Sequence, residues 1–141
     1  ESWAALKYVS NNHMMLGHLM EWFYSGICGI RQVADSGSYD NILITPEIVG
    51  DLTWAEAKTN SIHGEISSSW KIEKDILTIR VNIPVNCKAV VAVPQSDPAR
   101  ITENNIPIAE SKEVKVISET NGKTLCGISS GEYLFKTPFI R

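Results

Sequence analysis

The segment of residues 12–30 constrains the fold most strongly, because it is almost free of charge and contains no proline. A segment of this length and composition favours a helix over a series of short strands. Its apolar residues occupy too many positions to share one stripe of that helix: Met14, Met15, Leu16, Leu19, Met20, Trp22, Phe23, Ile27 and Ile30. A helix that is apolar around most of its circumference is buried around most of it. We therefore expect one long helix, covered in part by protein that a domain of this size does not supply itself.

Glycines mark the end of the expected helix. Gly26 and Gly29 lie where it would fray and stop, and Arg31 follows with a positive charge that suits a helix C-terminus. A membrane span is the competing interpretation of so apolar a segment. His18 and Glu21 near its middle, the internal glycines and the lack of a flanking basic cluster count against a span. We therefore expect no membrane partner.

Length, charge and cysteine content set wider limits. With 141 residues, the chain is long enough for one domain with a core plus an appendage. Its formal charge of -3 comes without a clustered stripe of lysine and arginine, so we expect no nucleic-acid partner. Cys28, Cys87 and Cys126 show no metal-ligand spacing, and we expect small buried hydrophobic residues. A bridge between Cys87 and Cys126 stays open, because both fall in apparent strands.

The hydrophobic pattern changes from a helical period to a period of two after residue 31. Segments rich in β-branched or aromatic residues then recur at residues 41–45, 52–59, 63–73, 75–84, 88–93, 113–119 and 132–137. Residues 95–112 are typical of a loop or irregular insertion, and 121–122 (Asn-Gly) and 130–131 (Ser-Gly) of turns. The sequence therefore predicts a mostly β fold, an antiparallel β-sandwich of about seven or eight strands preceded by one long apolar α-helix.

A series of short motifs carries a resemblance to a known family. They are residues 1–3 (ESW), 12–13 (NH), 21–24 (EWFY), 28–30 (CGI), 44–46 (ITP), 52–55 (LTWA), 61–70 (SIHGEISSSW) and 127–135 (GISSGEYLF). In order and spacing they resemble the end of the catalytic domain of glycoside hydrolase family 78, the bacterial α-L-rhamnosidases, followed by its C-terminal sandwich. The likeness covers nearly the whole chain except residues 95–112.

The resemblance implies an (α/α)6-barrel catalytic domain, of which residues 1–31 form the terminal helix and residues 32–141 the accessory β-sandwich. In that family, a carboxylic acid on an earlier segment protonates the glycosidic oxygen, while the Glu of an E-x-W motif activates water. Glu1, followed by Trp3, matches that motif. His13 matches a histidine that contacts the bound rhamnose, although Met14 stands where the family often has an aromatic residue.

The residues by themselves support less specific interpretations of these positions. The first residue of a chain is usually frayed, a histidine at a helix start is usually a capping-region side chain, and an aromatic near a domain junction usually packs. Inverting hydrolysis also needs two carboxyl groups about 6.5–9.5 Å apart, so that water fits between the base and the sugar. Glu1 alone cannot meet this need, and we expect the isolated chain to be inactive.

The sandwich offers its own candidates. Trp54 and Trp70 could form a platform for a sugar, but alternating strand positions favour the core for both. His63 and Glu65 are too sparse for a metal site, and we expect no metal and no cofactor.

Two functional hypotheses follow. The first is a piece of an inverting glycoside hydrolase that cleaves terminal α-L-rhamnose, with Glu1 as catalytic base and with His13 and Trp3 as substrate contacts. Its partners are a rhamnose-containing glycan or glycoside and the remainder of the catalytic domain. The second is a non-catalytic carbohydrate-binding or structural sandwich that docks through its helix. In either case we expect the isolated chain to self-associate through the apolar helix, which must be covered.

Overall fold

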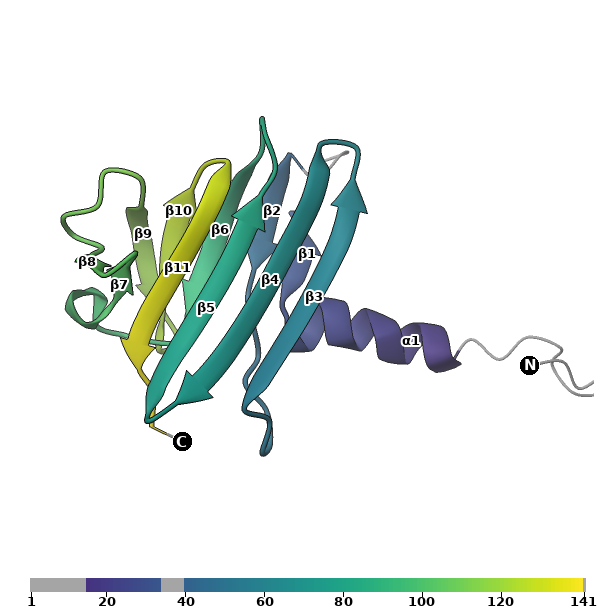
Figure 1. Ribbon diagram of the computed structural model, residues 1–141, viewed down its shortest axis with the longest axis horizontal. Coiled ribbons are helices and arrows are strands. Elements are labelled where there is room, and N and C mark those ends of the chain that lie inside the picture. Colours follow the sequence, from purple (N-terminus) through teal and green to yellow (C-terminus); the bar gives the residue numbers. More distant parts are fainter. Residues whose placement is uncertain (1–14, 34–39, 141) are drawn as a thin grey trace, which may run out of the picture.

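Two β-sheets pack face to face, and one helical segment extends from their edge (Figure 1). The structure is a computed structural model that describes residues 15–33 and 40–140, with helix side chains described from Leu19 onward. Glu1, Trp3 and His13 therefore lie outside the described residues. The fold is mostly β, as the sequence predicts.

The first sheet contains five strands in the order β1-β2-β6-β10-β9, and the second contains six in the order β3-β4-β5-β11-β7-β8. The strands of the first sheet are β1 (Ile30–Gln32), β2 (Asn41–Ile44), β6 (Lys88–Val93), β10 (Lys123–Ile128) and β9 (Lys115–Thr120). Those of the second are β3 (Trp54–Ser61), β4 (Gly64–Glu73), β5 (Ile76–Ile83), β11 (Gly131–Pro138), β7 (Thr102–Glu103) and β8 (Ile106–Pro107). A short 3₁₀ turn, Pro98–Arg100, precedes β7.

Alternation of side chains places the core between the two sheets. The apolar series of β5, namely Leu77, Ile79, Val81 and Ile83, is buried as its period of two predicts. Ile66 and Trp70 of β4 and Phe135 of β11 meet it in the same layer. The outward face of the second sheet carries the intervening polar residues, so the two faces differ in chemistry.

Turn chemistry fixes two of the hairpins. Asn121 and Gly122 both have positive φ, and they join β9 to β10 as the Asn-Gly pair predicts. Lys74 and Asp75 also have positive φ, and they join β4 to β5 with Glu73 opposite Ile76. The two-residue turns set the pairing of the residues next to each turn. Further from the turn, the register of β9 and β10 shifts at a bulge between Leu125 and Cys126.

The helical prediction for residues 12–30 is wrong in its extent. Among the described residues, α1 spans Met15–Trp22, a π-helical turn η1 spans Phe23–Ile27, and Ile30 already opens β1. Gly29 ends the helical path because its φ of 70° takes the backbone into the left-handed region. None of the helices in the described ranges is long and apolar enough to cross a membrane.

The predicted strand number and pairing also need correction. The described part of the chain contains eleven strands, and the pairing of β2 with β6 is parallel, whereas we expected about seven or eight antiparallel strands. The additional strands are β1, β7, β8 and β10. The first three have only two or three residues, which is too short for a period of two to be visible. In β10, a buried position holds the polar Thr124 and an outward position holds the apolar Leu125, so the sequence does not alternate clearly.

Candidate functional site

The described residues offer three candidate features: a junction between the helical segment and the sandwich, a hollow beside the helix, and a groove on the outer face of the second sheet. The residues predicted for catalysis and substrate contact, Glu1, His13 and Trp3, lie beyond the described ranges. Their placement therefore stays a prediction.

At the junction, β4 points two buried polar side chains at the end of the helical segment. Trp70 Nε1 donates a hydrogen bond to the carbonyl oxygen of Ile27 at 2.9 Å, and Ser68 Oγ donates one to that of Cys28 at 2.8 Å. Ser68 and Trp70 lie on one face of β4, because they are two residues apart in an extended strand. Both are buried, so this is the inward face. Trp70 is therefore a core residue, as its strand position predicts.

The helix itself is covered on only part of its circumference. Leu19, Met20, Trp22 and Phe23 are each 44–52% exposed, and the segment extends away from the two sheets (Figure 1). Met20, Phe23 and Trp54 also line a hollow of about 500 Å³ between the helix and β3. An exposed apolar surface of this kind marks an interaction site.

Trp54 contradicts the prediction that it packs in the core, because its side chain is 64% exposed. It begins β3 and shares the outward face of that strand with the charged residues Glu56 and Lys58. The sequence held a signal for this orientation, since Trp54, Glu56 and Lys58 have the same strand parity, whereas the alternate positions include Ala55 and Ala57.

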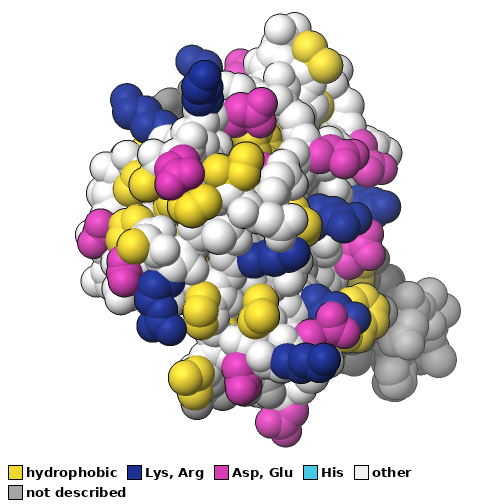
Figure 2. All heavy atoms as spheres, turned by 60° about the vertical axis from the view of Figure 1, so that its left-hand side comes forward, with side chains coloured by type: hydrophobic (Ala, Val, Ile, Leu, Met, Phe, Trp, Pro, Cys, Tyr) yellow, Lys and Arg dark blue, Asp and Glu magenta, His cyan; other side chains and the backbone are white. Residues whose placement is uncertain are grey.

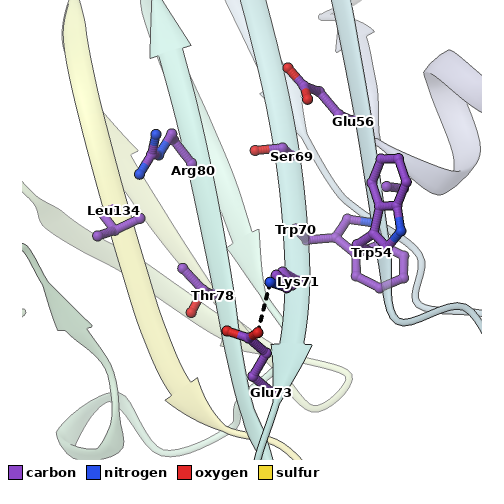
Figure 3. A pocket seen from close by; sticks show the side chains of 10 residues that line it. Trp54, Glu56, Ser69, Trp70, Lys71, Glu73, Thr78, Arg80 and Leu134 are labelled. Carbon is purple, nitrogen blue, oxygen red and sulfur yellow. Dashed lines mark ion pairs between the residues drawn. The ribbon is translucent and has the colours of Figure 1, made fainter.

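Trp54 lies at one side of a groove of about 430 Å³ on the outer face of the second sheet (Figure 3). The polar side chains that line the groove are Glu56, Ser69, Lys71, Glu73, Thr78 and Arg80. Lys71 Nζ lies 2.7 Å from Glu73 Oε1, and this pair lowers the pKa of the Glu73 carboxyl. An aromatic ring beside carboxylate, hydroxyl and guanidinium groups is a suitable surface for a polyhydroxylated ligand.

The cysteines are suited to packing and not to nucleophilic chemistry. Cys28, Cys87 and Cys126 are free and buried, so the bridge between Cys87 and Cys126 that the sequence left open is absent from the structure. Burial raises the pKa of the Cys28 and Cys126 thiols to about 11. These thiols are protonated at neutral pH, which confirms the interpretation as small buried hydrophobic residues.

His63 pairs with a carboxylate, and Glu65 plays no part in the pair. His63 Nε2 lies 2.6 Å from Asp40 Oδ1, and this contact joins the turn between β3 and β4 to the residue before β2. Within residues 15–33 and 40–140, no group of three or more ligand-type side chains could hold a metal ion.

Figure 2 shows basic and acidic side chains interspersed over the face on the side of β7, β8 and β9.

Comparison with known proteins relates the sandwich to one family. A family model described as the bacterial alpha-L-rhamnosidase C-terminal domain matches residues 29–106. An alpha-L-rhamnosidase of Formosa agariphila is 30% identical over 139 residues, which are 99% of this chain and 15% of the relative. A second one, from Streptomyces avermitilis, is 32% identical over 92 residues, which are 65% of this chain and 9% of the relative. This chain therefore spans only a small part of these relatives.

Solved structures agree with this relationship. The alpha-L-rhamnosidase from Dictyoglumus thermophilum superposes with a TM-score of 0.73 at 34% identity, over 92% of this chain and 14% of that one. The Streptomyces avermitilis alpha-L-rhamnosidase, solved in complex with L-rhamnose, gives a TM-score of 0.76 at 26% identity, over 91% of this chain and 12% of that one.

Proposed function

The chain belongs to the family of bacterial alpha-L-rhamnosidase C-terminal domains, and from this we propose that it is part of a glycoside hydrolase that removes terminal α-L-rhamnose from glycans or glycosides. The family match over residues 29–106 carries the proposal, and the similarity to two rhamnosidase structures supports it. In this proposal residues 1–31 complete the catalytic helical barrel and residues 32–141 form its accessory sandwich. The first strand of the sandwich, β1, begins at Ile30 and therefore starts within the last residues of the part that we assign to the barrel.

The proposed chemistry is inverting hydrolysis. Glu1 acts as general base and removes a proton from the water that attacks the anomeric carbon, while a carboxylic acid elsewhere in the larger protein protonates the leaving oxygen. His13 donates or accepts hydrogen bonds at the sugar hydroxyls, and Trp3 stacks on the sugar. The support for these roles is the resemblance of residues 1–3 and 12–13 to the family motifs.

The test is Glu1→Gln in the full-length protein that carries this chain. Loss of a general base lowers kcat by about 10²–10⁴-fold, so we expect a loss in that range on an aryl α-L-rhamnoside, with KM changed far less. Glu119→Gln, which changes an exposed carboxylate on β9 of the sandwich, is the matched control and leaves kcat unchanged. Unchanged turnover in Glu1→Gln removes this residue from the mechanism.

Two further measurements separate the parts of the proposal. Proton NMR of the first sugar released by the wild-type protein reports inversion at the anomeric carbon; a product of retained configuration contradicts the inverting mechanism but leaves the hydrolase assignment intact. The isolated chain of residues 1–141 shows no hydrolysis of the same substrate, because it lacks the general acid. Measurable turnover by the isolated chain would overturn the assignment of the acid to the rest of the protein.

The groove beside Trp54 supports a second candidate function, carbohydrate binding by the sandwich. The observation that favours it is the 64% exposure of Trp54 beside polar side chains. Trp54→Ala then weakens the binding of a rhamnose-containing oligosaccharide to the full-length protein by about two- to tenfold in calorimetry, since an aromatic contact is worth roughly 0.5–1.5 kcal/mol. Ile62→Ala, at an exposed apolar residue away from the groove, is the control. Equal affinities of wild type and Trp54→Ala contradict this candidate.

A further inference from the structure

The end of the helical segment is held by an uninterrupted series of hydrogen bonds from the sandwich. The carbonyl oxygens of residues 25 to 29 each accept one bond, from Arg31 Nε (2.7 Å), Glu47 N (3.2 Å), Trp70 Nε1 (2.9 Å), Ser68 Oγ (2.8 Å) and Thr45 N (2.9 Å), in that order. The last carbonyls of a helix have no partner within it and usually turn to water or a local cap. Here strands β1 and β4 and the segment after β2 supply the donors instead. We call these five bonds the carbonyl clamp.

Two bonds of the clamp, those donated by Ser68 and Trp70, are the most costly to break, because they are buried. Ser68 and Trp70 are almost inaccessible to solvent, and they stand 40 and 43 residues from their acceptors in the chain. A buried donor or acceptor left without its partner costs about 1–3 kcal/mol, so any shift of the helix end that breaks these bonds is disfavoured. The helix end therefore has one arrangement on β4.

Packing and backbone conformation add to this constraint. Ile27 and Cys28 are buried in the core of the sandwich, and Gly29 leaves the helix with positive φ beside the backbone of Thr45. In contrast, the apolar side chains nearer the start of the segment are exposed: Leu19, Met20, Trp22 and Phe23. The helical segment is thus fixed at one end only within the described residues, and the clamp sets its direction.

The length of the segment amplifies small changes at the clamp. Residues 15–27 span roughly 20 Å at the helical rise of about 1.5 Å per residue. A tilt of about 3° at the clamp then moves the far end by about 1 Å. A misplacement of about 1 Å at a catalytic site can cost about a hundredfold in rate. His13 lies two residues before Met15 in the sequence.

We propose that Ser68 and Trp70 are positioning residues of the hydrolase: they act through the helical segment and hold the substrate contact His13 in register with the rest of the active site. This inference rests on the proposed function. It gives the accessory sandwich a role in catalysis, because β4 determines where a residue of the catalytic domain stands. Neither residue touches the substrate.

The test uses the full-length protein and matched pairs of substitutions. Ser68→Ala removes one clamp donor, and Ser67→Ala is its control on the opposite face of the same strand and outside the groove. Trp70→Phe removes the other donor while keeping an aromatic ring, and Tyr133→Phe is its control at a buried aromatic residue outside the clamp. Arg31→Met removes a clamp donor from an exposed side chain, so it tests the clamp without disturbing the core.

Each variant is assayed on an aryl α-L-rhamnoside at a temperature where its near-ultraviolet circular dichroism matches the wild type, and its affinity for free L-rhamnose is measured by calorimetry. We expect kcat/KM to fall at least tenfold in Ser68→Ala and Trp70→Phe and about threefold in Arg31→Met, with weaker L-rhamnose binding in all three. The two controls stay within twofold of the wild type. A purely structural role of Ser68 and Trp70 lowers the melting temperature but leaves both constants of the folded protein unchanged.

The outcomes are distinct for the two proposals. An active wild-type protein whose folded clamp variants keep wild-type kcat/KM and L-rhamnose affinity overturns the positioning role alone. If either core variant does not fold, Arg31→Met decides, and wild-type values for it overturn the inference. A full-length wild-type protein that neither hydrolyses the rhamnoside nor binds L-rhamnose overturns the proposed function, and the positioning role with it.

Discussion

The carboxyl group of Glu103 lies in an environment that favours its neutral, protonated form. It is 3% exposed, and its two oxygens accept hydrogen bonds from Asn104 Nδ2 and Ser111 Oγ. Burial, with a further contribution from the charge of Glu113, raises the pKa of the Glu103 carboxyl above its ordinary value. The folded chain therefore binds a proton at Glu103 more tightly than the unfolded chain does.

The consequence is a pH-dependent stability. Because the pKa of Glu103 is higher in the folded state, its contribution to the free energy of unfolding is fully present below the unfolded value of 4.5 and is lost as pH rises through the raised folded pKa. Glu103→Gln keeps the size of the side chain and removes the charge. We expect the variant to melt at a higher temperature than the wild type at pH 7 and at nearly the same temperature at pH 4.

Thermal melts of the isolated chain across this pH range make the measurement. Glu110→Gln is the control, because Glu110 is exposed seven residues further along the chain. A higher melting temperature of the wild type than of Glu103→Gln at pH 7 would show that the fold favours the carboxylate form, contrary to the direction of the pKa shift.

The thiols give a second prediction for single residues. Since burial raises the pKa of Cys28 and Cys126 to about 11, almost no thiolate is present at pH 8, and thiolate is the reactive form. Native protein should therefore react with a disulfide reagent at least a hundredfold more slowly than protein in denaturant, where all three cysteines should react. Rapid labelling of the native chain would contradict the burial of these residues.

Among the elements, the transition from η1 to β1 depends on a glycine. Gly29 has a φ of 70°, and a β-carbon there would overlap the backbone of Thr45 and Pro46. Gly50 has a similar φ of 56° with nothing within 4 Å of such a β-carbon, so it matches the backbone strain without the overlap. Substitutions at Gly29 and Gly50 therefore separate two costs in the free energy of unfolding: the strain of a positive φ, which both share, and the steric overlap, which occurs only at Gly29.

We expect Gly29→Ala to lower the free energy of unfolding by at least about 3 kcal/mol, and Gly50→Ala by only about 1 kcal/mol. Urea unfolding of the two variants measures the difference. Equal losses would mean that the helix end shifts to accommodate the methyl group, and the clamp would then be looser than its hydrogen bonds indicate.

At the scale of the whole molecule, the helix exposes apolar surface that the two sheets do not cover. Leu19, Met20, Trp22 and Phe23 lie close to one another in sequence and are exposed. The helix extends away from the two sheets (Figure 1). In the larger protein we expect the helical barrel to cover them. In the isolated chain, the surface available for burial is that of a second copy.

We therefore expect the isolated chain to self-associate with increasing concentration in sedimentation velocity. Leu19→Gln combined with Phe23→Gln shifts it toward the monomer, because it removes apolar surface from the helix. Ile62→Gln changes an apolar residue that is 82% exposed at the turn between β3 and β4, and it leaves the association unchanged. A wild-type chain that stays monomeric over the same concentrations contradicts this expectation.

The sequence by itself determined the β class, the long strands β3 to β6, the turn at residues 121–122 and the burial of Trp70 and the cysteines, because period and turn chemistry are local properties. The family resemblance, which the family model confirms, came from the order of short motifs. The tertiary structure decided the parallel pairing of β2 with β6 and the attachment of the helix end to β4, since each depends on contacts between distant segments. The carbonyl clamp has the same origin: its buried donors stand 40 and 43 residues from their acceptors, and no local pattern records such a separation.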